Sequence, residues 1–270
     1  MLVPALLLAT LAGATPVATS SAAAAPLERF EIDPVTDSAI LSLSAGFGLL
    51  SQAIIGTGEI APQTPGDPSK LLGIDRGVVT NGGEVKGSRV VSDALVAGAF
   101  AWAAVDTVLT AVLDSRHERA LSYLIIYLET MSLNLAAGNL AKIAVRRPRP
   151  EAYQAVAAGG TIEDTDASLS FYSMHTAFTA GLGATATYLA FERGGEVEPW
   201  VVLGATVVVT SVVGTNRVLG RAHFPTDVIA GALAGAGLGV LVPHLHRRSD
   251  LRLSVGPGPG DAGLSLSGVF

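Results

Sequence analysis

Long apolar stretches dominate this chain and restrict what it can fold into. The last two stretches, Trp200–Thr215 and Val228–Val242, lack a polar face. Helices of this kind are either buried in a large core or span a bilayer. We therefore predict an all-α fold: a helical bundle of five to six mostly apolar helices, which we expect to be membrane-embedded. The predicted helices are Ala39–Ile55, Ala94–Leu113, Ala120–Ala141, Phe171–Phe191, Trp200–Thr215 and Val228–Val242.

The composition agrees with a membrane protein. Only 15% of the residues are charged, whereas soluble domains carry roughly 25%, and the mean hydropathy is +0.49. The formal net charge of −6 argues against a general nucleic-acid binder. The absence of cysteine excludes disulfides, thiolate metal sites and cysteine nucleophiles. The 31 glycines would let helices pack closely, as membrane helices often do.

We divide the chain into four segments. Residues 1–25 are uncharged, apolar and then rich in small residues, which predicts a signal peptide or an N-terminal anchor. Residues 26–92 hold the lead-in helix and a long loop, for which the sequence does not decide between a lid and disorder. Residues 93–246 form the helical core, and residues 247–270 form a tail that is either a short hairpin or irregular.

The stretch NRVLGRAHFPTD carries the most specific polar pattern. A helix is expected to begin near Phe224, because Pro225 is a natural first-turn residue. His223 then lies at the mouth of that helix, with Asp227 one turn further in on the same face. A carboxylate so placed accepts one imidazole N–H and leaves the other nitrogen for chemistry. The alternative is a helix cap with an incidental ion pair.

A basic cluster, KIAVRRPRP, ends the second core helix. Lys142, Arg146 and Arg149 are spaced to share a helical strip until Pro148 stops the helix. Arg147 is expected to point elsewhere. The alternative is a positive-inside cluster that flanks a membrane helix.

A third polar cluster, SLSFYSMHT, precedes an apolar helix. Ser173 is a good candidate for its N-cap, and the exposed N–H groups behind it would form an anion site. His175 lies in the first turn of the same helix. The alternative is that His175 is a histidine at a helix end with no functional role.

Together the clusters bring histidines, an aspartate and several cations to helix ends. The cations and the helix N-terminus can hold a phosphate-like anion, which arginine forks neutralise. One histidine can attack this anion or take a proton, while the other donates a proton to the leaving oxygen. No carboxylate cluster of the kind that holds Mg²⁺ or Ca²⁺ accompanies them. We therefore expect phosphoryl transfer with no metal and no cofactor.

The order and spacing of the three blocks resemble the signature of the type-2 phosphatidic acid phosphatase superfamily, which also includes acid phosphatases and vanadium haloperoxidases. That signature is Lys-x6-Arg-Pro, then Pro-Ser-Gly-His, then Ser-Arg-x5-His-x3-Asp. The resemblance covers roughly Ala94–Val242 and leaves the substrate open. In this chain the blocks read Lys142…Arg149-Pro150, Tyr172-Ser173-Met174-His175 and Asn216-Arg217…His223…Asp227.

The resemblance implies a mechanism. His223 would be the nucleophile that forms a phosphohistidine, Asp227 would orient its ring, and His175 would protonate the leaving oxygen. The family needs no metal. The residues that would hold the phosphoryl oxygens, with nearby backbone N–H groups, are Lys142, Arg149, Arg217 and Ser173, and Met174 completes the phosphate-binding positions.

Three positions depart from the signature. Tyr172 replaces proline and Asn216 replaces serine, and both changes are expected to be mild. Met174 in place of glycine is the serious change, because glycine permits a positive φ or a close approach to the phosphate. If the backbone at this position is helical, Met costs little; if it is not, phosphate binding is weakened.

The predicted function is a metal-independent phosphatase that acts on a lipid phosphate or diphosphate at the membrane. Alternating spans place the three blocks on one face, which we expect to be the periplasmic or outer face of the inner membrane. A conflict remains, because a cleaved signal followed by a spanning Ala39–Ile55 would put the blocks inside. Either that helix does not cross, or residues 1–25 are not a cleaved signal; the third option is a soluble exported protein.

Two other functions stay open. One is a vanadate-dependent haloperoxidase, in which vanadate would occupy the phosphate position. The other is a catalytically weakened phosphate- or lipid-binding membrane protein, motivated by Met174. The sequence does not indicate an oligomeric state.

Overall fold

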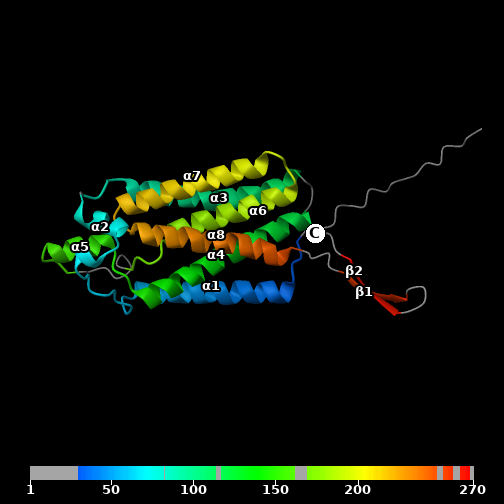
Figure 1. The fold of residues 1–270 in the computed structure, drawn as a ribbon, viewed down its shortest axis with the longest axis horizontal. Coiled ribbons are helices and arrows are strands. Elements are labelled where there is room, and N and C mark those ends of the chain that lie inside the picture. The colour runs from blue at the N-terminus through cyan, green and yellow to red at the C-terminus, as the bar shows by residue number, and fades with distance from the viewer. Residues whose placement is uncertain are drawn as a thin grey trace, which may run out of the picture.

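The computed structural model describes residues 30–81, 83–113, 117–161, 169–247, 252–257 and 262–267. The predicted signal peptide or anchor, residues 1–25, lies outside the described residues. The long helices run side by side as one elongated bundle (Figure 1). They are α1 (Pro34–Gly56), α3 (Ser88–Leu113), α4 (His117–Val145), α6 (Met174–Arg193), α7 (Glu198–Leu219) and α8 (Pro225–His246).

The all-α prediction is confirmed, with α6 as the central helix. It packs against α8, α7, α4 and α3, while α1 packs along α4. Three short elements lie at one end of the bundle: η1 (Pro68–Lys70) and α2 (Gly73–Thr80) in the long loop, and α5 (Pro150–Ala157) after α4. In the tail, β1 (Arg252–Pro257) pairs antiparallel with β2 (Ala262–Ser267), so this part of the tail is a hairpin.

The surface and the interior have the polarity of a membrane protein. Five described helices, α1, α3, α4, α7 and α8, are long and apolar enough to cross a membrane. Large apolar side chains such as Leu43, Val108 and Leu233 are exposed on them. Polar side chains such as Thr130 and Asn134 are buried inside the bundle. This distribution suits a lipid solvent, because internal polar groups then find partners within the protein.

Helix α1 is part of the bundle along its whole length. Gly48 lies so close to Leu135 of α4 that an added Cβ would come within 2.8 Å of it. Asn139 of α4 donates a side-chain hydrogen bond to the Gly48 carbonyl at 2.8 Å, and the lead-in helix is thus fixed to the core by polar as well as apolar contacts.

A glycine stripe on α8 lets that helix pack backbone to backbone on α6. Gly231, Gly235 and Gly239 recur every four residues and therefore share one face. An added Cβ would lie 2.5 Å from the Ser173 carbonyl oxygen at Gly231 and 2.1 Å from the Ala177 carbonyl oxygen at Gly235. Such close approach is typical of membrane helices. Because Ser173 is the residue just before α6, the stripe also fixes the start of α8 against the start of α6.

We predict that Gly235→Ala lowers the stability of the protein, because the new methyl group overlaps the α6 backbone; overpacking of this kind costs about 1–3 kcal/mol or more. Gly237→Ala is the matched control, since nothing lies within 4 Å of its added Cβ. Thermal unfolding of both variants in detergent checks the prediction. Equal melting temperatures for the two variants would contradict the close packing.

Candidate active site

The three sequence blocks meet at one end of the bundle, beside α2 and α5 (Figure 1). They meet there because α4 and α7 end at the same place where α6 and α8 begin. The predicted residues take these positions: Lys142 in the last turn of α4, Arg149 at the N-cap of α5, Ser173 at the N-cap of α6, Arg217 in the last turn of α7, and Asp227 in the first turn of α8.

His223 lies in the turn between α7 and α8 and is 2% exposed. Its Nδ1 is 2.8 Å from the backbone carbonyl oxygen of Ser170. A carbonyl only accepts, so Nδ1 carries the hydrogen, and Nε2 of the neutral ring keeps its lone pair. Burial, with the nearby charges of Arg149 and Arg217, lowers the pKa of His223 to about 3. The ring is therefore neutral at physiological pH, as a nucleophile must be.

Asp227 does not hold the ring through the hydrogen bond that we predicted. Its Oδ2 is 3.9 Å from His223 Nδ1, which is beyond hydrogen-bond range. The same oxygen accepts the backbone N–H of Phe224 at 2.9 Å. Asp227 thus caps α8 and shapes the turn that carries His223, while the Ser170 carbonyl orients the ring. The sequence did not indicate a role for Ser170, because this residue acts through its backbone carbonyl.

The basic cluster is arranged differently from our prediction. Helix α4 ends at Val145, and Arg146 takes a left-handed conformation with φ of 48°. The predicted helical strip therefore breaks before Arg149, and Arg146 is exposed. The break turns Arg147 toward the site, where we had expected it to point elsewhere.

Arg147 joins two buried carboxylates. Its guanidinium donates to Asp227 Oδ1 at 2.6 Å and to Asp75 Oδ2 at 2.8 Å, and both aspartate side chains are 0% exposed. It also lies over the Phe224 ring, 3.9 Å from the centroid. Asp75 belongs to α2, and it accepts the backbone N–H of Thr226 at 3.1 Å. Asp75 therefore joins the described part of the long loop to the start of α8.

His175 meets a carboxylate that the sequence did not reveal. Its Nε2 is 2.8 Å from Oδ1 of Asp93, near the start of α3. The same oxygen accepts a hydrogen bond from Arg217 Nη1 at 3.1 Å. The side chains of His175 and Asp93 are 31% and 57% exposed, so this side of the site is open.

Arg149 and Arg217 lie near enough to His223 for their charges to lower its pKa. Lys142 and Arg217 are buried, at 7% and 6% exposure. Among the described residues, the buried Nε of Arg217 has no hydrogen-bond partner, which leaves one guanidinium donor for an anion. Ser173 caps α6, with its hydroxyl 2.9 Å from that of Thr176.

Met174 is the first residue of α6 and does not have a positive φ. Of the two alternatives for this position, the helical one holds, so the glycine of the signature is not needed for backbone conformation. The Met174 side chain packs against Gly138 of α4, where an added Cβ would lie 1.8 Å from the Met174 sulfur. Gly138 thus provides the space that Met174 fills. Asn216, another departure from the signature, donates its side-chain N–H to the Val212 carbonyl of its own helix.

Comparison with protein-family models finds a match. The family model described as PAP2 superfamily matches residues 123–250, a range that contains all three blocks. Searches of curated proteins and of solved structures find no match for the chain.

Proposed function

Since this chain belongs to the PAP2 superfamily over residues 123–250, which includes phosphatases, we propose that it hydrolyses a lipid phosphate or diphosphate by metal-independent phosphoryl transfer. The observation that carries the proposal is the state of His223. This ring is buried and neutral, and its Nδ1–H is bound to the Ser170 carbonyl. Its Nε2 lone pair can therefore attack phosphorus while Arg149 and Arg217 neutralise the negative charge of the phosphoryl oxygens.

In the first step, His223 Nε2 forms a bond to phosphorus as the bond to the leaving oxygen breaks. His175 gives that oxygen a proton, so the lipid alcohol or lipid phosphate leaves. In the second step, water attacks the phosphohistidine, His175 takes a proton from it, and inorganic phosphate is released. Lys142, Arg149, Arg217 and the N-terminus of α6 stabilise the charge on the phosphoryl oxygens in both steps.

An apolar cavity beside the site supports a lipid substrate. It has a volume of about 350 Å³ and lies between α3, α6 and α7. Its lining begins at Leu95, two residues after Asp93, and at Thr179, one turn after His175. The cavity continues to Trp102 further along α3. A phosphate held at the open side of the site can therefore place its acyl or prenyl chain along the bundle.

We predict phosphate release from lipid substrates in the presence of EDTA, measured with purified protein and a panel of phosphatidic acid, phosphatidylglycerol phosphate, undecaprenyl diphosphate and lipid A. His223→Ala is expected to lower the rate by at least about 1,000-fold, because it removes the nucleophile. His244→Ala, at the other end of α8, is the matched control and should keep the native rate. Equal rates for native protein and His223→Ala would exclude the mechanism.

Asp93 is proposed as a positioning residue for His175. Burial and the charge of Arg217 lower the pKa of His175 to about 4. The Asp93 carboxylate at 2.8 Å fixes the ring and acts against this shift, because it favours the protonated form that acts as an acid. We expect Asp93→Asn to lower kcat by about 10- to 100-fold and to have no further effect in a His175→Asn background. Additive losses in the double variant would show that Asp93 does not act through His175. The control measurement is the pH dependence of kcat, whose basic limb should move to lower pH in Asp93→Asn.

We also propose that the site end faces the periplasm or the outside. Helix α1 runs along the whole bundle, so in this orientation its start lies in the cytoplasm and residues 1–25 are not a cleaved signal. The absence of native cysteine makes this testable with single cysteines. In intact cells, a membrane-impermeant maleimide should label Ala158→Cys at the site end and leave Glu196→Cys at the other end unlabelled, although both positions are exposed. The reverse pattern would place the site inside.

A further inference from the structure

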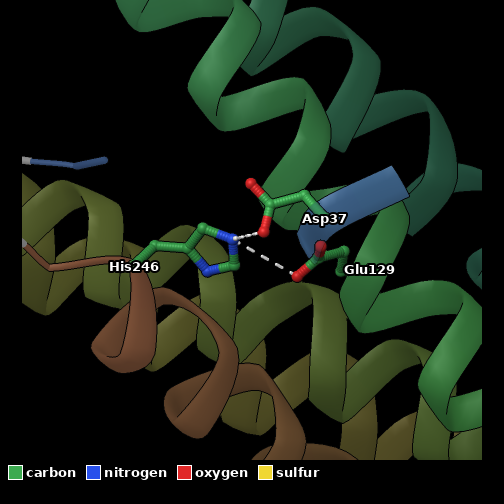
Figure 2. A group of neighbouring side chains, drawn as sticks. All are labelled: Asp37, Glu129 and His246. Atoms are coloured by element: carbon green, nitrogen blue, oxygen red, sulfur yellow. Dashed lines mark ion pairs between the residues drawn. The ribbon is translucent and has the colours of Figure 1, made fainter. Parts of the chain in front are cut away.

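A second group of ionisable side chains lies at the opposite end of the bundle. Asp37 of α1, Glu129 of α4 and His246 of α8 point toward one another (Figure 2). They are 6%, 1% and 8% exposed. His246 Nε2 is 3.4 Å from Asp37 Oδ1 and 3.4 Å from Glu129 Oε2, and the three ligand atoms all lie within 4.8 Å of one another. We call these three residues the distal triad.

The hydrogen bonding of His246 leaves a lone pair directed at two carboxylates. Its Nδ1 is 2.9 Å from the Val242 backbone carbonyl, so Nδ1 carries the hydrogen. Histidines that bind metals are commonly oriented by such a bond to a backbone carbonyl. Among the described residues, His246 Nε2, Asp37 Oδ2 and Glu129 Oε1 are buried without a hydrogen-bond partner. Buried lone pairs and negative charges of this kind are costly unless a cation compensates them.

The two distances from His246 Nε2 suit a metal ion that lies between the three side chains. Zn²⁺ binds imidazole nitrogen and carboxylate oxygen at about 2.0–2.2 Å. Two ligands at that distance with a tetrahedral angle between them are about 3.4 Å apart. Both nitrogen–oxygen separations in the distal triad have this value. A direct charge-assisted hydrogen bond would instead bring the atoms to about 2.7–2.9 Å.

We propose that the distal triad binds a divalent first-row transition metal such as Zn²⁺ or Mn²⁺. Imidazole with two carboxylates favours these ions, whereas Mg²⁺ and Ca²⁺ prefer oxygen ligands alone. A cavity of about 480 Å³ adjoins the triad and is also lined by Glu31, Asp33 and Arg247. It gives the ion a route of entry and leaves space for water at its remaining coordination positions.

The bound metal would join α1, α4 and α8 directly at this end. Near the triad, the start of α1 is linked to the end of α8 through the Glu31 N–H, which donates to the His246 carbonyl at 2.8 Å. The metal adds direct bonds from α1 and α4 to α8. Helix α8 has 22 residues and is about 33 Å long, so the distal triad is far from His223 at its other end. The site is therefore separate from the phosphatase machinery.

The test is the metal content of the full-length protein without a polyhistidine tag. After EDTA treatment and its removal, the protein is titrated with Co²⁺, Zn²⁺ or Mn²⁺; bound metal is measured by mass spectrometry, and Co²⁺ also by its visible absorption. We expect one metal per chain and a melting temperature that rises with the metal. Glu129→Gln and His246→Gln should each weaken binding by at least about 100-fold.

His244→Gln is the matched control, because His244 lies on the same helix and contacts Tyr188 rather than the triad. It should bind metal as the native protein does. The isosteric Asp37→Asn serves if His246→Gln does not fold. Absence of metal uptake by the native protein would overturn the proposal and show that His246 holds only a proton. Native affinity in the triad variants would overturn it as well, by placing the metal elsewhere.

Discussion

The bridge that Arg147 makes between two buried carboxylates is the interaction on which the active-site end depends. It connects Asp75 of the long loop, the segment after α4, and Asp227 of α8. Each carboxylate is fully buried, so each needs the guanidinium as its counter-charge. Removing one partner of such a buried group costs about 3–5 kcal/mol. Through Asp227, the bridge also fixes the turn that carries His223.

The chemistry follows from where polar groups can lie in an apolar bundle. The helix ends supply N–H donors, and the cations collect there because the apolar helix interiors offer them no partners. Burial keeps His223 neutral, and the Ser170 carbonyl fixes which of its nitrogens has the lone pair. The glycine stripe of α8 brings the starts of α6 and α8 into backbone contact, and the charges of Arg149 and Arg217 act on both His175 and His223. Packing and the proposed catalysis thus depend on the same helix pair.

Much of this arrangement was predictable from the sequence, because it rests on local patterns. Apolar stretches located the long helices, and fixed spacings located His175, His223 and the cations at helix ends. Contacts between distant segments were not predictable. Asp93 meets His175 only after α3 and α6 pack, and Arg147 turns inward only because Arg146 breaks the helix. The distal triad joins side chains of α1, α4 and α8, and no motif links them in the sequence.

The nucleophilic role of His223 is tested most directly by identifying the covalent intermediate. Native protein is mixed with a ³²P-labelled lipid phosphate, quenched in alkaline detergent to preserve phosphohistidine, and digested for mass spectrometry. We expect a phosphoryl group on His223, which is absent from His223→Ala. A phosphoryl group on His175 instead, or steady turnover with no phosphorylated histidine in rapidly quenched samples, would contradict it.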